Sequence, residues 1–404
     1  MASKELKQGQ SSLWQRVYPP IPDKIAERTK IVLLDFVCRL IIYWPMQLLV
    51  MFSSFMQLMY YRFVIEYMTR FKGKSVGEDA HMKTSDAVFA GVNVRIHLPK
   101  HPSGNGAIIY IHGGGFTLLS ARAYDFVTRT ICQQSGLFVV SIDYRLSPEH
   151  KHPAAVNDCE KAVVHFLTSA YKEYSVDPRK VVIMGDSAGG NLTAVTIQRL
   201  QALNVPQPKL QILIYPWTQM IDFQLPSYQM MEKYNATSLL NPVQMARFTL
   251  HYLIGPSIDR YIPDILANRH HTAEFRQAPS LDYIRHDQVP KSFSLQDFVY
   301  DADRSMPQSV NQELYDSLKP HLLNPEVSPL LHPNLKGQPK AMVITMEYDP
   351  LRDEGIIYVE RLKKAGVPTT HKHYQDGIHG VIFYDIKLSY QLISDIIAYI
   401  NENL

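Results

Sequence analysis

A serine flanked by glycines stands where a tight turn can present a nucleophile. The sequence GDSAG at 185–189 follows the apolar run 181–184 and precedes a stretch that is compatible with a helix. A G-x-S-x-G sequence between a strand and a helix is typical of a nucleophile elbow, a turn too tight for side chains beside the serine. This context predicts that Ser187 attacks a carbonyl carbon and that the Ala188 N–H faces the oxygen of that carbonyl.

Three consecutive glycines offer further N–H groups for a negatively charged oxygen. HGGG at 112–115 directly follows the apolar run 107–111. Glycines let the backbone approach a substrate with no side chain in the way. Loops of this kind form an oxyanion hole together with the residue after the nucleophile. The predicted donors are the N–H groups of Gly113, Gly114, Gly115 and Ala188, and His112 is interpreted as a structural residue that holds the loop.

A serine hydroxyl needs a general base at neutral pH. His379 lies in DGIHG at 376–380, a glycine-bounded loop that follows a short strand predicted at 371–374. Such a loop can place an imidazole over the edge of a sheet. His371 and His373 fall within the predicted strand and share one of its faces, because side chains alternate along a strand. His379 is therefore the predicted base, and the two strand histidines are interpreted as structural.

An acid that orients the histidine is expected between the serine and the histidine in chain order. Asp349 stands at the end of the apolar run 341–346, before a proline that blocks further strand pairing. Asp353 is better interpreted as a first-turn acid of the next helix, where the helix dipole favours a negative charge. Asp349 is the predicted acid, with Asp353 and Glu347 as alternatives. Its role would be to hold the tautomer of His379 and stabilise the imidazolium that forms.

Short apolar strands alternate with helices over most of the chain. Strands are predicted at 92–98 (with a weaker hairpin partner at 87–89), 107–111, 137–142, 181–184, 210–215, 341–346 and 371–374. Helices are predicted at 121–134, 154–170, 188–203, 353–365 and 386–402. This alternation favours an α/β fold with a mostly parallel central sheet and helices on both faces.

Two regions fall outside the alternation. Residues 217–339 are Pro-rich, show no strand rhythm and are predicted to form a helical cap inserted over the carboxyl edge of the sheet, where open α/β folds bind ligands. The first 80 residues are predicted to form an N-terminal cap or a membrane-associated segment. The catalytic domain is therefore expected at 81–404.

The uncharged stretch 40–61, within the first 80 residues, is long enough to cross or contact a membrane. As a helix it would span about 33 Å, close to the hydrocarbon thickness of a bilayer. Aromatic residues lie near both of its ends, as in membrane-interface belts, whereas Pro45 and Gln47 argue against a spanning helix. Three interpretations remain: a transmembrane helix, attachment in the plane of the membrane, or a packed soluble cap.

The composition excludes several classes of function. A net charge of +3 over 404 residues, without a dense Lys/Arg run, gives no support for nucleic-acid binding. Cys38, Cys132 and Cys159 form no C-x-x-C pair, so they predict neither a zinc site nor a disulfide framework and are interpreted as buried apolar residues. No metal or cofactor is needed for the chemistry above.

Together these motifs resemble the hormone-sensitive-lipase branch of the α/β-hydrolases. The matching pieces are HGGGF at 112–116, DYRLSPEH at 143–150, GDSAGGNL at 185–192, DPLRDEG at 349–355 and DGIHG at 376–380. The subgroup that the chain resembles most is that of the arylacetamide deacetylases and neutral cholesterol ester hydrolases, to which YPPIPD at 18–23 also fits.

The resemblance implies a serine carboxylic-ester hydrolase with the triad Ser187, Asp349 and His379, and it favours Gly114 and Gly115 over Gly113 as donors. The implied substrate is a small apolar ester, an acetylated amide or a neutral lipid ester. The implied location is a membrane, that of the endoplasmic reticulum. Subgroup members carry cysteines where this chain has Thr117 and Met346, which argues against a lumenal catalytic domain and leaves the cytosolic face or the cytosol open. The alternative function is a non-catalytic ligand-binding protein on the same scaffold.

Overall fold

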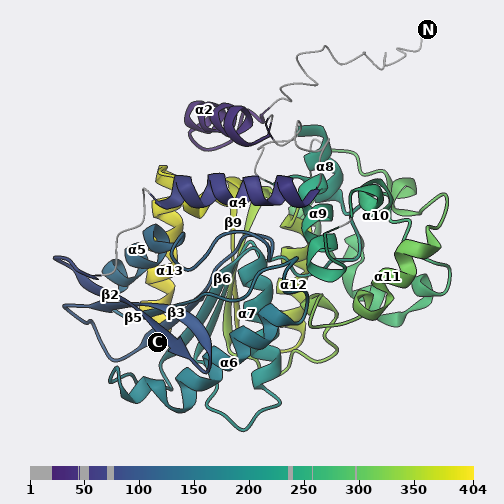
Figure 1. Ribbon diagram of the computed structural model, residues 1–404. Helices are drawn as coiled ribbons and strands as arrows, with labels where there is room; N and C mark the ends of the chain where they lie inside the picture. Colours follow the sequence, from purple (N-terminus) through teal and green to yellow (C-terminus); the bar gives the residue numbers. More distant parts are fainter. Residues whose placement is uncertain are drawn as a thin grey trace.

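A twisted sheet forms the centre of the molecule. The computed structural model describes residues 21–43, 45, 54–70, 77–234, 240–256, 258–295 and 298–404. Within these residues the strand order is β1-β2-β3-β5-β4-β6-β7-β8-β9 (Figure 1). The strands are β1 (Gly77–Glu78), β2 (Met82–Phe89), β3 (Val92–Pro99), β4 (Ala107–Ile111), β5 (Phe138–Ile142), β6 (Val181–Asp186), β7 (Leu210–Ile214), β8 (Lys340–Tyr348) and β9 (Thr369–Ile378). Pairing is antiparallel from β1 through β3 to β5 and parallel from β5 to β9.

Helices cover both faces of the sheet, as the sequence predicts. Ile108 and Tyr110 of β4 pack into one apolar cluster, and Ile109 and Ile111 pack into a second one on the other face, because side chains alternate along a strand. The first face is covered by α5 (Asp125–Ser135) and α13 (Lys387–Asn403), and the second by α6 (Ala154–Thr168), α7 (Ala188–Leu200) and α12 (Arg352–Lys364). The predicted α/β-hydrolase architecture is confirmed.

The prediction of a short strand at 371–374 followed by a loop was wrong. β9 extends to Ile378, because the register with β8 shifts between Met346 and Tyr348 and pairing then resumes as Tyr348 with Ile378. The chain approaches a neighbouring side chain closely at this shift, since a Cβ on Gly377 would lie 2.3 Å from the Met346 sulfur and would displace it. His379 is therefore the first residue after β9, and the paired Ile378 beside it holds this part of the chain against β8.

The polypeptide between β7 and β8 is helical in its described residues. It contains α8 (Pro226–Tyr234), α9 (Pro242–Leu253), α10 (Ile262–Leu266) and α11 (Gln312–Leu322), and short 3-10 turns lie between α9 and α11. α9 starts where it does because the Asn241 side chain accepts the N–H of Gln244 and a proline occupies the first helical position. Figure 1 shows these helices gathered at one side of the sheet.

Two N-terminal helices lie over the carboxyl edge of the sheet. They are α2 (Arg28–Cys38), which continues into a π-helical turn (Arg39–Tyr43), and α4 (Ser54–Arg70). Figure 1 shows α4 lying across the sheet with α2 above it. Of the stretch 40–61, residues 44 and 46–53 lie outside the described residues. In the part of the chain that is described, no helix has both the length and the hydropathy to cross a membrane.

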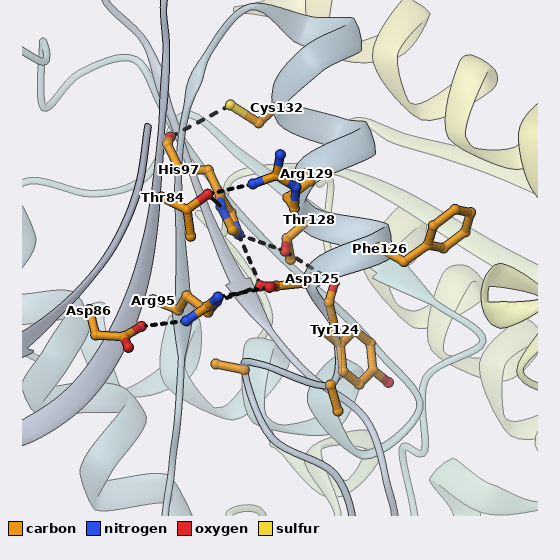
Figure 2. A network of polar contacts seen from close by, with 12 residues as sticks. Thr84, Asp86, Arg95, His97, Tyr124, Asp125, Phe126, Thr128, Arg129 and Cys132 are labelled. Carbon is orange, nitrogen blue, oxygen red and sulfur yellow. Dashed lines mark hydrogen bonds and ion pairs between the residues drawn. The ribbon is translucent and has the colours of Figure 1, made fainter. Parts of the chain in front are cut away.

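A buried ion-pair cluster fastens α5 to the antiparallel side of the sheet (Figure 2). Arg95 of β3 forms two hydrogen bonds with the carboxylate of Asp125, the first residue of α5, and donates a third to Asp86 of β2 at 2.7 Å. His97 lies beside this pair, and its Nε2 is 2.9 Å from the Thr128 hydroxyl. Burial lowers the pKa of His97 to about 3, so this ring is neutral. We call Asp86, Arg95, His97, Asp125 and Thr128 the α5 cluster.

Candidate active site

Ser187 occupies a strained turn between β6 and α7. Its backbone has φ 56° and ψ −121°, a conformation that non-glycine residues rarely adopt, and its N–H donates to the Ile214 carbonyl at 2.9 Å. The chains around the turn approach so closely that a Cβ on Gly189 would lie 2.0 Å from the Ile111 oxygen, and one on Gly185 would lie 2.4 Å from the Gly189 oxygen. The two glycines therefore allow the turn that exposes the serine hydroxyl.

The three residues proposed from the sequence as nucleophile, base and acid meet at the carboxyl edge of the sheet. The Ser187 Oγ lies 2.9 Å from Nε2 of His379, and Nδ1 of His379 lies 2.7 Å from Oδ2 of Asp349. Because a carboxylate can only accept, Nδ1 donates and Nε2 is left to accept the serine proton. Asp349 is fully buried, its second oxygen accepts the Leu351 N–H at 2.8 Å, and the Tyr215 ring packs against the imidazole.

The alternative acids and histidines are engaged elsewhere. Asp353 accepts a backbone N–H from the first turn of α8 at 2.9 Å, and Glu347 pairs with an arginine of α12 at 2.8 Å. His371 and His373 lie on one face of β9, as expected, and a ring nitrogen of each is 2.8 Å from the Thr345 hydroxyl. The geometry therefore favours Asp349 and His379 over the other candidates.

One of the predicted oxyanion donors is already occupied. The N–H of Gly113 donates to the Tyr124 hydroxyl at 2.9 Å and to Oδ1 of Asp186 at 3.1 Å, so it is not available to a substrate. Including Gly113 among the donors was therefore wrong, for the physical reason that its N–H turns inward to a buried carboxyl. Gly114 and Gly115, with φ of 113° and 59°, line the cavity beside the nucleophile. Ala188 is the first residue of α7, where helix N–H groups have no intrahelical acceptor.

His112 supports the loop from behind. Its ring stacks on Tyr144 with 4.2 Å between centroids, and Nδ1 lies 2.8 Å from the Gly113 carbonyl. Burial lowers the pKa of this histidine, so the ring is neutral and fits a structural role. The sequence-based interpretation of His112 agrees with this position.

A buried carboxyl under the elbow was missed by the sequence reasoning. Asp186 accepts hydrogen bonds from the hydroxyls of Tyr110 at 2.9 Å and Tyr124 at 2.8 Å, besides the N–H of Gly113. Burial raises the pKa of Asp186 to about 6, although these hydrogen bonds and the nearby His379 oppose the rise. Asp186 thereby ties the glycine loop to the elbow. The only signal in the sequence was its place next to the serine.

An apolar cavity of 230 Å³ opens onto the serine. Its walls come from three parts of the chain: the loops of the sheet, the α8–α11 region and the N-terminal helices. Leu240 and Phe248 line it from the α8–α11 region, and Leu34, Cys38, Tyr61 and Ile65 line it from α2 and α4. Burial raises the pKa of Cys38 to about 11, so it stays a neutral thiol. All three cysteines are free and buried, as predicted, but the contribution of Cys38 to the cavity was not foreseen.

Fold and site together define a class. The mostly parallel sheet carries a serine at a strand–helix elbow, with a histidine and a buried aspartate hydrogen-bonded in line with it. Two glycines of the loop after β4 border an apolar cavity beside this serine. That combination is the one used for acyl transfer from esters. The protein is a carboxylic ester hydrolase.

Comparison with known proteins agrees with this class. The chain belongs to the α/β hydrolase fold family, whose model matches residues 108–281 and 279–383. It is similar to arylacetamide deacetylase of Oryctolagus cuniculus, with 31% identity over 407 residues that cover 96% of each chain. Neutral cholesterol ester hydrolase 1 of Bos taurus is 32% identical over 380 residues, covering 91% of this chain and 90% of that protein. Among solved structures, the hyperthermophilic esterase from the archaeon Pyrobaculum calidifontis has a TM-score of 0.63 and 28% identity, covering 85% of this chain and 93% of that one.

Proposed function

We propose that the protein hydrolyses small apolar carboxylic esters through an acyl-enzyme on Ser187. The observation that carries the proposal is the continuous line of hydrogen-bonding atoms from Ser187 through His379 to Asp349, at 2.9 and 2.7 Å, beside an apolar cavity. The similarity to an arylacetamide deacetylase and a neutral cholesterol ester hydrolase supports the same conclusion.

The proposed reaction has two acyl-transfer steps. Ser187 Oγ attacks the ester carbonyl while Nε2 of His379 takes its proton, and the N–H groups of Gly114, Gly115 and Ala188 hold the oxygen that becomes negative. His379 then protonates the leaving alcohol, whose C–O bond breaks to leave an ester on Ser187. A water molecule, deprotonated by the same imidazole, attacks this ester, and the serine leaves with the proton. Asp349 keeps Nδ1 protonated throughout and stabilises the imidazolium.

The size of the cavity favours a short acyl group. Its volume of 230 Å³ is below the range of about 300–1,000 Å³ that is usual for small-molecule sites. Apolar side chains dominate the wall, so a charged acyl group would lose its hydration without a partner. We therefore place short-chain esters ahead of long-chain lipid esters as substrates.

Hydrolysis of a p-nitrophenyl ester series from acetyl to palmitoyl tests the proposal. We expect the highest kcat/KM at acetyl or butyryl, and a loss of about 10⁴-fold or more in the Ser187→Ala variant. A maximum at long chains would move the substrate class to neutral lipid esters. Wild-type turnover by Ser187→Ala would show that the nucleophile is assigned wrongly.

A non-catalytic ligand-binding protein is the second candidate. The same scaffold can bind ligands without chemistry. The aligned base and acid argue against it here, because binding alone requires neither. A fluorophosphonate probe distinguishes the two: rapid labelling at Ser187 supports the hydrolase, and its absence in folded protein supports the binding protein.

We also propose that the two N-terminal helices dock on a membrane surface. Their outer faces carry large apolar side chains, among them Leu33 at 65% exposure, Leu40, Ile41 and Phe63 at 69% exposure. The inner faces of the same helices line the cavity, so docking would place its wall beside apolar esters dissolved in the membrane. The resemblance to the deacetylase subgroup supports the endoplasmic reticulum as that membrane.

Flotation with phosphatidylcholine vesicles tests the docking surface. The Leu33→Ser/Phe63→Ser double variant should float several-fold less than the wild type. Leu203→Ser is the matched control, since Leu203 is also exposed, at 39%, but follows the C-terminal end of α7, the end away from Ser187. Equal flotation of the wild type and the double variant would overturn the docking proposal without affecting the ester reaction.

The division of the chain follows from these roles. We propose residues 1–80 as an N-terminal cap that contacts the membrane, residues 81–404 as the catalytic domain, and the insertion at about 217–339 as a second cap. Leu240 and Phe248 in the cavity wall support the role of the insertion, and Tyr61 and Ile65 support that of the N-terminal region.

A further inference from the structure

The helix α4 presents three different faces, each repeated at a spacing of four residues. Tyr61 and Ile65 line the cavity. Arg62 and Glu66, one position further on, contact the segments that follow the glycine loop and β5. Phe63 points to the outside. Because residues four apart lie above one another on a helix, α4 can contact substrate, loop and surroundings at once.

The Arg62 guanidinium joins α4 to two loops at the carboxyl edge of the sheet. Its Nε donates to the Thr117 carbonyl at 2.6 Å, and its Nη2 donates to the Ser147 carbonyl. Nη1 and Nη2 also bind the two oxygens of Glu149, at 2.5 and 3.0 Å. One side chain from outside the sheet thus bonds to the loop after β4 and the loop after β5 together.

Both residues whose carbonyls Arg62 binds are hydrogen-bonded to the turn that shapes the glycine loop. The Thr117 N–H donates to the Gly114 carbonyl at 3.1 Å, and the Ser147 N–H donates to the Phe116 carbonyl at 2.9 Å. Gly114 and Phe116 have φ of 113° and 60°, a left-handed conformation that is costly for phenylalanine. Such a turn persists only when its surroundings hold it.

Removing the guanidinium would take away the charged part of the support for this turn, while the stacking of Phe116 on Tyr252 would remain. The Thr117 and Ser147 carbonyls would each lose a charged donor, and Glu149 would lose its partner. The cavity remains in place, because Tyr61 and Ile65 hold α4 through apolar packing. The expected result is a loosened glycine loop inside an otherwise intact site.

We infer that Arg62 is a positioning residue that holds the Gly114 and Gly115 N–H groups at the oxyanion position. The inference rests on the proposed function, since it assigns Arg62 a part in stabilising the tetrahedral intermediate. Arg62 acts through the loop and does not touch the substrate. Oxyanion donors act only when negative charge develops, so their misplacement lowers kcat and leaves KM nearly unchanged.

Steady-state hydrolysis of p-nitrophenyl acetate by Arg62→Ala tests the inference. A displacement of about 1 Å at a reacting centre costs on the order of 100-fold, so we expect kcat to fall about 10- to 100-fold. KM should stay within about threefold of the wild type. Added guanidinium ion at millimolar concentration should restore part of kcat, which a loss of folding stability would not allow.

Arg199→Ala is the matched control. Arg199 is 20% exposed, as Arg62 is, and it likewise forms a bidentate pair with a partly exposed glutamate, Glu326. It lies in the last turn of α7, away from the glycine loop. A loss in Arg62→Ala no larger than that in Arg199→Ala, or a loss confined to KM, would overturn the inference.

Glu149→Gln keeps the inference testable if Arg62→Ala does not fold. This variant weakens the ion pair with Arg62 but leaves the arginine in place. We therefore expect a smaller fall in kcat, about 3- to 10-fold, again at constant KM. An unchanged kcat in Glu149→Gln would then contradict the inference. An error in the proposed function would show itself differently: the Ser187→Ala variant would hydrolyse the ester as fast as the wild type. The two failures can therefore be told apart.

Discussion

Carboxyl groups are buried in both the α5 cluster and the candidate active site, but their hydrogen-bond donors differ between the two regions. In the α5 cluster, Asp125 faces the full charge of Arg95 through two hydrogen bonds (Figure 2). Beneath the nucleophile, Asp186 receives hydrogen bonds from two tyrosine hydroxyls and one N–H. Asp349 likewise accepts hydrogen bonds from a backbone N–H and from Nδ1 of the His379 imidazole.

The type of partner distinguishes a carboxyl that holds the structure together from a carboxyl placed beside the reacting groups. A full opposite charge opposes the rise in pKa that burial causes in Asp125, and it holds two elements together, as Arg95 does between β3 and α5. Neutral donors leave the protonation state responsive to its surroundings, and a base beside such a carboxyl can change charge without breaking an ion pair. The variants below, ordered by expected effect, test whether each region does only one of these tasks.

The largest effect is expected for Asp349→Asn. An amide at this position can donate to Nδ1 of His379 and thereby favours the tautomer that cannot accept the serine proton. We expect kcat to fall about 10⁴-fold with the fold unchanged, which hydrolysis of p-nitrophenyl acetate and circular dichroism would measure. A loss under tenfold would remove Asp349 from the proposed triad and weaken the contrast between the two regions.

Asp125→Asn should affect stability and leave the chemistry nearly unchanged. It removes the bidentate partner of the buried Arg95 guanidinium, and losing one partner of a buried pair costs about 3–5 kcal/mol. Urea denaturation would measure the free energy of unfolding, and kcat of the folded fraction should stay within about twofold. The control Asp86→Asn removes a carboxylate that is 60% exposed and should cost under about 1 kcal/mol. Similar decreases in the free energy of unfolding in the two variants would contradict the claim that the buried carboxylate contributes more than the exposed one.

Asp186→Asn should change how stability depends on pH. Burial raises the pKa of Asp186 to about 6, above the value of 3.8 that applies when it is exposed. The folded state therefore keeps a proton that the unfolded state has lost between about pH 4 and 6. The contribution of this carboxyl to the free energy of unfolding is full below pH 4 and falls by about 2 kcal/mol as the pH rises to 6. Urea denaturation at both pH values should show this fall in the wild type and lose it in the variant; parallel pH profiles would contradict the raised pKa.

The candidate catalytic residues could be predicted because they stand in short motifs at the ends of strands. Parallel strands bring their carboxyl ends to one edge, so the elements that carry Ser187, Asp349 and His379 had to converge once the alternation of strands and helices was recognised. The glycines of 113–115 were found in the same way. Only the occupied N–H of Gly113 differed, because its direction depends on Asp186, one element away.

The parts of the site that the sequence did not predict depend on contacts between distant segments, and such contacts leave no local sequence pattern. Tyr110 and Tyr124 appear in the sequence as ordinary apolar positions of a strand and a helix, and only the fold shows that both hydroxyls reach one carboxyl. The wall provided by Tyr61 and Ile65 was obscured because the stretch 40–61 carries no charged residue, so the charge pattern could not indicate which face of the helix lies inside. The extension of β9 escaped prediction because a polar, glycine-containing segment continues the strand after a register shift.

The position of α4 affects how the protein can be shortened. Deleting the first 76 residues would remove an exposed apolar surface and is an obvious way to raise solubility for crystallisation or inhibitor screening. The same deletion would remove Tyr61 and Ile65 from the cavity wall and Arg62 from the glycine loop. Inhibitors selected on such a truncated form would fit an open, less selective site. Single polar substitutions on the outer face, such as Phe63→Ser, retain the pocket that a selective compound must recognise.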